Sequence, residues 1–450
     1  MSFTNTGTYA TAVAMGSTSV QRRISRWKPL VEAYVSLLLF MVVYCARPED
    51  WIPGLSHVPF AKITGVLAWL ALMFSLRQVR YSFPREVIYL ALLAGQLFLA
   101  SLMSPVWRGG AVQQTLDFAK VVLIVIVMSV ALTTASRLRR LIFVQAASVA
   151  VIAAVAVWKG RSLVGRLEGT FGGNYSNPND LALAIVISLP LCLALLFLSR
   201  SRLWKAAWAL AMVVMLYVIF LTGSRGGFIS LIVVAGVCLW EFAIRGRRRY
   251  LFLIAGLAGV TLWLSSSGML AGRLNGTFNS QEDVASAYDS AQARQDLFWR
   301  SVAVTKQHPF FGVGPGNFEE LSGSWHVTHN SYTQMSSEGG MPALILYALI
   351  LWFGFKNVRA TKRFGRAQRE LVILAGGLQA GLAGYVVGSV FASTAYQFFP
   401  YLLVSYTTAL FSIAKITALH SKESKSVSQK TFENEACAQT SRSGMSWHLG

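Results

Sequence analysis

Charged residues are scarce in this chain, and acidic ones are the scarcest. Only 13% of the 450 residues are charged, and 19 acidic residues stand against 40 basic ones. The hydrophobic share of 54% and the mean hydropathy of +0.51 are too high for a soluble domain of this length. The composition therefore excludes a soluble protein and indicates a membrane protein.

Cysteines and paired acidic residues are also lacking. The four cysteines lie far apart, so they predict neither a disulfide framework nor a metal site. No Asp-x-Asp pair occurs and the aspartates are scattered, which argues against a metal-dependent transferase site. We expect no metal ion and no cofactor.

Long apolar runs dominate what is present. A helix needs about 20 apolar residues to cross a hydrocarbon core of ~30 Å. Helix is the expected state because backbone groups in lipid must be satisfied within the segment. The sequence thus predicts an all-α polytopic membrane protein with about twelve spans: 30–46, 60–76, 87–103, 117–134, 138–158, 180–198, 203–222, 226–244, 250–266, 338–355, 370–392 and 396–417.

The basic residues sort by side of this predicted membrane. Most of the 40 fall in the two tails and in alternate short loops, such as 245–249 and 356–369. The positive-inside rule makes that side the cytoplasm, with both termini inside. The net charge of +21 is therefore a topology signal and predicts no nucleic-acid partner.

Five parts follow from this topology. They are a cytoplasmic tail (1–28), spans one to nine (29–266), a large periplasmic insert between spans nine and ten that would form a catalytic loop (267–337), spans ten to twelve (338–418) and a second cytoplasmic tail (419–450). Inserts of this length are usually functional or disordered.

Arginines also gather at the predicted outer ends of spans. Arg225 lies in the turn Thr222-Gly223-Ser224-Arg225-Gly226-Gly227, Arg161 and Arg166 follow span five, and Arg294 lies in the insert. The guanidinium fork suits phosphate oxygens, so converging arginines predict an anionic headgroup or a pyrophosphate. Helix-end arginines can also simply snorkel or cap a turn.

Polar residues of the insert offer further candidates. His329 precedes Asn330 and Tyr332 at its end, although a single histidine is more often structural. Glu338 could orient that imidazole or mark a helix N-terminus. Glycines at 312, 314 and 316 predict a plain turn rather than a phosphate loop, because no strand precedes them and no Lys-Ser/Thr follows.

The order of these short motifs resembles the O-antigen ligase and polymerase family of bacterial envelope proteins. The resemblance covers roughly residues 165–355 and is strongest from 294 to 342. It rests on Asn177-Pro178-Asn179, Ser224-Arg225-Gly226, Arg294 with Trp299, His308-Pro309, Gly312-Val313-Gly314-Pro315-Gly316, His329-Asn330 and Gly339-Gly340.

The resemblance implies metal-independent glycosyl transfer at the outer face of the bacterial inner membrane. The donor would be a polyprenyl-pyrophosphate-linked glycan, and the acceptor a hydroxyl of a glycan, lipid or protein. His329 would be the general base, with Arg225 and Arg294 stabilising the departing pyrophosphate. Arg161, Arg166, Asn179, Asn330 and Tyr332 would contribute to substrate binding, and the reaction would invert the anomeric centre.

Three alternatives stay open at this point, and one of them is an inactive scaffold for an envelope assembly complex, which the clustered histidine and arginines disfavour. A polymerase of the same family would differ from a ligase only in its acceptor. A twelve-span transporter would share the topology, but transporters tend to place charged residues near the bilayer midplane. The predicted spans here are nearly free of such charge, which disfavours transport.

Overall fold

The computed structural model describes residues 30–55, 58–76, 83–160, 162–163, 166–167, 175, 177–266, 281–323, 326–366 and 368–419. Over this part of the chain the fold is helical, apart from a two-residue antiparallel pair, β1 (Ser162–Leu163) and β2 (Arg166–Leu167). The predicted all-α class is confirmed. The predicted tails lie almost wholly outside the described residues, as does the beginning of the predicted insert.

Each predicted apolar segment lies on a helix. The helices are α2 (Leu30–Ala46), α3 (Pro48–Trp51), α4 (Phe60–Leu76), α5 (Arg85–Leu102), α6 (Arg108–Ala131), α7 (Ala135–Lys159), α8 (Pro178–Leu198), α9 (Arg202–Thr222), α10 (Arg225–Cys238) with its π-helical continuation η1 (Leu239–Ile244), α11 (Tyr250–Ser266), α13 (Gln281–Gln307), α14 (Phe318–Leu321), α15 (Ser331–Phe364), α16 (Arg369–Gly388) and a last helix, Phe398–Leu419.

Ten of the described helices are long and apolar enough to cross a membrane. The helices α4 and α11 have 17 residues each, at the lower limit for a span. The tenth predicted span starts earlier than predicted, because Asn330 caps α15 and the helix begins at Ser331. Its kink at Gly340, φ 80°, lies two residues after the predicted start of the span at residue 338.

Small side chains let the central helices pack closely. The helix α16 packs against both α8 and α10, and most of its residues are buried. A Cβ at Gly384 would lie 2.4 Å from Val234 Cγ2 on α10, and one at Gly377 would lie 2.8 Å from the carbonyl oxygen of Pro190 on α8. Close approach of this kind is typical of helix pairs in membranes, where packing replaces the hydrophobic drive.

The predicted basic loops meet at one end of this helix group, which we call the basic end. Arg137 at the start of α7 lies over the Tyr34 ring of α2, and Arg139 pairs with Glu370 at the start of α16. Phe364 near the end of α15 contacts Phe411 of the last helix. These contacts place the start of α2, the start of α7, the end of α15 and the start of α16 at the basic end, and the orientation of this end in the membrane stays a prediction.

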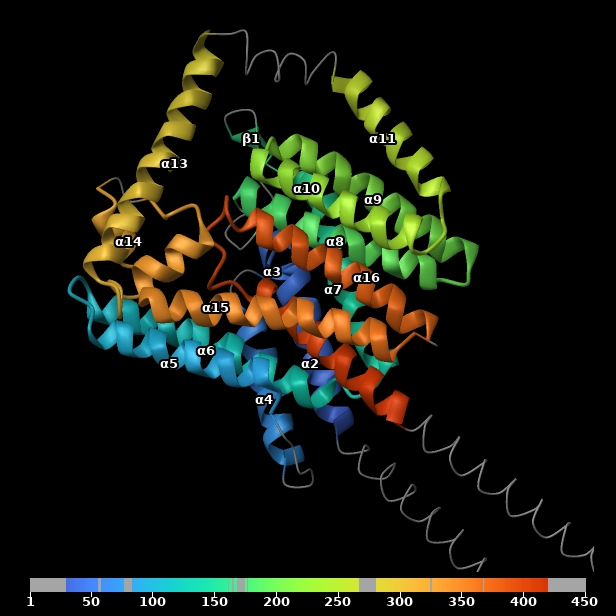
Figure 1. Ribbon diagram of the computed structural model, residues 1–450, viewed down its shortest axis with the longest axis horizontal. Helices are drawn as coiled ribbons and strands as arrows, with labels where there is room; N and C mark the ends of the chain where they lie inside the picture. Colours follow the sequence, from blue (N-terminus) through green and yellow to red (C-terminus); the bar gives the residue numbers. More distant parts are fainter. Residues whose placement is uncertain are drawn as a thin grey trace, which may run out of the picture.

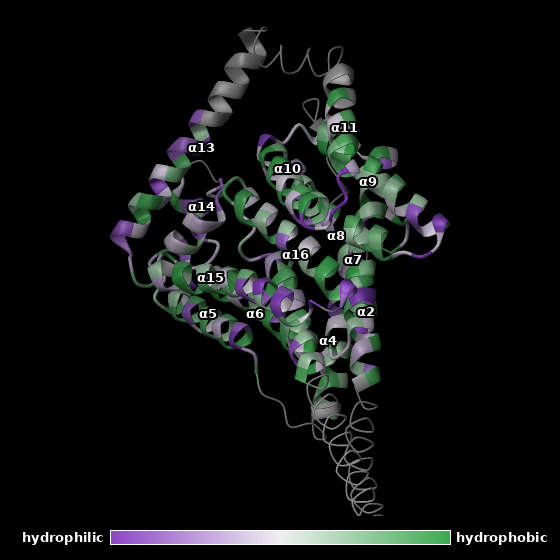
Figure 2. Ribbon diagram, turned by 45° about the vertical axis from the view of Figure 1, so that its right-hand side comes forward, coloured by the Kyte–Doolittle hydropathy of each residue, from purple (hydrophilic) through white to green (hydrophobic). Residues whose placement is uncertain are grey.

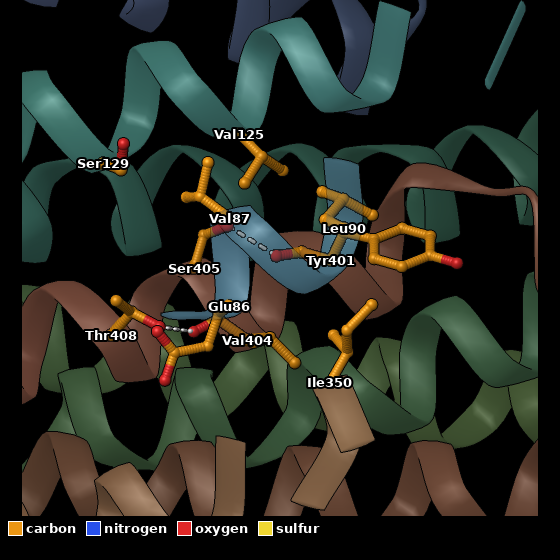
Figure 3. Close-up of a pocket in the computed structure, with 10 residues that line it drawn as sticks. All are labelled: Glu86, Val87, Leu90, Val125, Ser129, Ile350, Tyr401, Val404, Ser405 and Thr408. Atoms are coloured by element: carbon orange, nitrogen blue, oxygen red, sulfur yellow. Dashed lines mark hydrogen bonds between the residues drawn. The ribbon is translucent and has the colours of Figure 1, made fainter. Parts of the chain in front are cut away.

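A small cavity with a mainly apolar lining lies near the basic end, between α5, α6, α15 and the last helix (Figure 3). Glu86 lines it and accepts a hydrogen bond of 2.7 Å from the Asn357 amide, which also donates to Thr408 at 3.2 Å. With about 10 Å³ the cavity has room for about one water. The cavity is too small for a ligand, and the hydrogen bonds beside it join α5, α15 and the last helix.

The opposite end carries α13, α14 and the turn 309–317. Figure 1 shows α13 and α14 at the edge of the molecule beside the beginning of α15, which runs along α5. Figure 2 shows polar stretches on α13, whereas α9 is apolar over much of its length. This end contains the candidate site.

Candidate functional site

Arg225 is held at the first position of α10. Gly223 ends α9 in the left-handed conformation, φ 58°, and Ser224 caps α10 by accepting the Gly227 N–H at 3.2 Å. The Ser224 hydroxyl donates at 2.9 Å to the side-chain oxygen of Asn179 at the start of α8. The predicted turn is therefore confirmed, and it places Arg225, with an exposed side chain, next to Asn179.

The two glycines after Arg225 allow α10 to begin in a crowded place. A Cβ at Gly226 would lie 2.5 Å from Phe391 Cβ, and a Cβ at Gly227 would lie 2.8 Å from Ala182 Cβ. Real Cβ atoms do not approach so closely, so both positions need glycine. The start of α10 thus packs directly on α8 and on the turn that follows α16.

Arg294 and His329 come from two other segments. Arg294 lies at the middle of α13 and is half-buried, and His329 directly precedes the Asn330 cap of α15. His329 has a φ of +51°, a left-handed conformation that few non-glycine residues adopt. Strained backbone of this kind clusters at functional sites.

The charges of these residues act on one another. The pKa of His329 is lowered from 6.5 to about 4, mainly by burial and in addition by the nearby charges of Arg294 and His326. Burial also lowers the pKa of Arg294, and Arg225 adds to the effect. The structure therefore places Arg294 within electrostatic range of both Arg225 and His329, and the lowered pKa of His329 favours a neutral imidazole near pH 7.

A turn that the sequence did not single out connects these segments. Residues 389–397 follow α16, and their Phe391 packs on the start of α10. The hydroxyls of Ser393 and Thr328 lie 3.0 Å apart, and Ser331 donates to the Ala392 carbonyl at 2.7 Å. The turn thus links the Arg225 side of the site to the His329 side; its only signal in the sequence is a short Ser/Thr-rich break between apolar runs.

The polar groups of Asn330 and Tyr332 form hydrogen bonds within the protein. The Asn330 side-chain oxygen accepts the N–H groups of Tyr332 and Thr333, at 2.9 and 3.1 Å. The Tyr332 hydroxyl donates to the Val386 carbonyl at 2.8 Å and accepts from Ser389 at 3.2 Å. These contacts fix the loop that carries His329, and a role in sugar binding stays a prediction.

The remaining predicted arginines are not placed at the site. Arg161 lies outside the described residues, and for Arg166 the structure describes only the backbone, in β2. Their part in substrate binding stays a prediction.

Glu338 has neither of the two roles considered for it. It lies buried within α15, past the first two turns, and its carboxylate accepts the Gly316 N–H at 3.1 Å. The carbonyl of Glu338 accepts the Gly314 N–H at 2.9 Å. Glu338 therefore holds the glycine turn against α15 instead of orienting His329.

The glycine turn itself is a plain turn, as predicted. Gly312, Gly314 and Gly316 all have positive φ. The Asn317 amide donates to Ser104 Oγ at 2.8 Å and to the Trp107 carbonyl at 3.1 Å, and Gln96 on α5 donates to the Phe310 carbonyl at 2.7 Å. The turn anchors the segment between α13 and α14 to the α5–α6 connection, and so fixes α13 with Arg294.

Comparisons with known proteins give one family match and one distant structural similarity. No curated protein matches the chain. A chain from a solved structure of a peptidoglycan synthase complex, which coordinates polymerization and crosslinking, is similar over 73% of this chain and 95% of its own length, at 15% identity and a TM-score of 0.38. Residues 210–348 match the family described as O-antigen ligase, a range that contains Arg225, Arg294 and His329. The resemblance seen in the motifs is thus confirmed, and the chain is O-antigen ligase-like over residues 210–348.

Proposed function

We propose that the protein transfers a glycan from a polyprenyl-pyrophosphate carrier to an acceptor hydroxyl at the outer face of the bacterial inner membrane. The observation that carries the proposal is the convergence of Arg225, Arg294 and His329 from three separate segments. The family match over residues 210–348 supports a membrane glycosyltransferase of the ligase type.

His329 would accept the proton of the acceptor hydroxyl. The acceptor oxygen attacks the anomeric carbon while the bond between that carbon and the pyrophosphate oxygen breaks. An attack in line with the leaving group inverts the anomeric centre. Only a neutral imidazole can take the proton, and burial together with Arg294 keeps His329 neutral at physiological pH.

Arg225 and Arg294 would stabilise the departing pyrophosphate. Two like charges held close to each other lose part of their repulsion when a polyanion binds between them. Donors that are already in place where negative charge develops lower the barrier without reorganisation. Pyrophosphate then leaves without a carboxylate pair of the kind that glycosidases use.

The acceptor distinguishes a ligase from the polymerase of the same family. We infer that the protein is a ligase, and a polymerase is the alternative. Deletion of the gene distinguishes the two functions. Free lipid-linked polymer should accumulate if the protein is a ligase, and single repeat units if it is a polymerase.

The direct test uses purified protein in lipid with a synthetic polyprenyl-pyrophosphate glycan and its acceptor. His329→Ala and His329→Gln should each lower the transfer rate by about 10²–10⁴-fold, the usual effect of one positioned base, and should keep donor binding. EDTA should leave the wild-type rate unchanged. Full activity in either variant removes His329 from the mechanism.

A further inference from the structure

A large cavity opens at the basic end, on the far side of the molecule from His329. It has a volume of about 1020 Å³ and lies between η1, the end of α15 and the start of α16. The helix from Arg225 to Ile244 has 20 residues, so the cavity is ~30 Å from the start of α10. It is therefore separate from the proposed transfer site.

Basic side chains line this cavity. One lysine and six arginines do so: Arg245, Arg248, Arg359, Lys362, Arg363, Arg366 and Arg369. Among the described residues that line it, Glu241 is the only acidic one. We call the cavity lined by these seven residues the basic cavity.

The single carboxylate of the basic cavity, that of Glu241, already pairs with two of the basic residues. Glu241 is buried, and its oxygens lie 3.2 Å from Arg245 and 2.7 Å from Lys362. Glu370, next to Arg369 in sequence, pairs instead with Arg139 at 3.0 Å. The other five arginines of the basic cavity therefore have no carboxylate partner among the described residues.

The arginines also repel one another. Arg248 lies 4.0 Å from the centre of the Phe197 ring, and its pKa is lowered, first by burial and also by the charge of Arg369. A topology signal alone needs only exposed cations at the end of a span, such as Arg200, Arg202 and Lys205 before and in the first turn of α9. Cations gathered around a cavity, with one acid among them, fit an anion that enters it.

The remaining walls define the kind of anion. Trp240 and Phe242 of η1 and Val372 and Ile373 of α16 contribute apolar surface beside the arginines. Arginine forks bind phosphate oxygens in pairs, and basic pockets between helices on the cytoplasmic side bind lipid headgroups. A π-helical turn such as η1 is itself frequent at functional sites.

We propose that the basic cavity binds a phosphate-ester anion, and that this anion is the headgroup of an anionic phospholipid. Arg363, Arg366 and Arg369 hold the phosphate, while the apolar wall contacts the adjoining glycerol and acyl carbons. The site is independent of glycosyl transfer, because it lies at the other end of the helices.

The test measures binding to the full-length protein in detergent. The probes are dioleoylphosphatidylglycerol, dioleoylphosphatidylcholine and inorganic pyrophosphate, each titrated and followed by native mass spectrometry. The cavity variant carries Arg363→Gln, Arg366→Gln and Arg369→Gln. The control variant carries Arg200→Gln, Arg202→Gln and Lys205→Gln, which removes three exposed charges that do not line the cavity.

We expect saturable binding of phosphatidylglycerol to the wild type, at least about tenfold weaker binding to the cavity variant, and less than about a twofold change in the control, because each basic residue near an anionic lipid contributes several-fold. A variant with lysine at the same three cavity positions should retain part of the binding and shows that the fold tolerates the changes. If pyrophosphate binds more strongly than phosphatidylglycerol, the ligand is a soluble phosphate and the proposal of a phospholipid ligand is wrong. Equal loss in both triple variants, or equal binding of phosphatidylcholine, overturns the site.

Discussion

The electrostatic link between Arg294 and His329 leads to a prediction about pH. The pKa of His329 is lowered from 6.5 to about 4, which corresponds to about 3 kcal/mol against the imidazolium at roughly 1.4 kcal/mol per pH unit. Protonation inactivates a general base, so kcat/KM should stay level from neutral pH downward and fall only as pH approaches about 4. A solvated histidine would give that fall near 6.5.

The substitution Arg294→Gln should move this acid limb to higher pH. Removing a positive charge stabilises the imidazolium, which raises the pKa of His329. Burial is the larger cause of the lowered pKa and stays in place, so the limb should lie between about 4 and 6.5. The bound pyrophosphate should act in the same direction in the wild type. The acid limb of kcat should therefore lie above that of kcat/KM.

The assay is the initial rate of transfer at several donor concentrations between pH 3.5 and 8, with recovery of activity at pH 7 checked after each acid exposure. The substitution Lys306→Gln serves as the control, because it removes an exposed charge from the same helix, 12 residues or ~18 Å further on. An acid limb that stays in place in Arg294→Gln, or that moves equally in Lys306→Gln, refutes the coupling.

Three further predictions test the rest of the site. Arg225→Ala should abolish transfer without loss of protein from the membrane, and Arg225→Lys should restore only part of it because lysine lacks the fork; equal rates for all three proteins would contradict the pyrophosphate role. Gly226→Ala should lower the rate and the melting temperature through its clash, whereas Gly236→Ala on the same helix, where a Cβ meets nothing within 4 Å, should be neutral or stabilising. Cysteine at position 294 should react with an impermeant thiol reagent added to intact spheroplasts, and cysteine at position 363 should not; the reverse pattern would invert the proposed orientation.

The helices could be predicted because their signal is local. An apolar run of about 20 residues specifies a helix whatever lies beside it, and a basic loop specifies its side of the membrane. The boundary of α15 is the main departure from the prediction. Hydropathy falls over the polar turns from Ser331 to Glu338, yet Asn330 supplies a good N-cap and the turn 309–317 satisfies the backbone at the kink. A search for apolar runs does not detect a polar helical segment that is buried against other segments of the chain.

The charged residues of the site could also be predicted, but their supports could not. Arg225 sits among turn residues and His329 beside a cap, and both patterns are local. Asn330 and Tyr332 are polar and close to His329, so the sequence favoured a role in sugar binding, whereas their hydrogen bonds go to the fold. Which partner a polar side chain finds depends on segments far away in the sequence, and no local pattern encodes that.

The same reasoning explains why the site needs the whole helix group. Arg225 is fixed by α8 and the 389–397 turn, His329 by that same turn, and Arg294 by a helix whose end is tied to α5 and α6 through the glycine turn. Each tie joins segments distant in sequence, and the arginines repel each other at the point where they meet. Packing of the apolar helices must therefore offset that repulsion in the absence of a donor. The same repulsion is what a bound pyrophosphate would relieve, so the ordering that brings these cations together also favours binding of a polyanion.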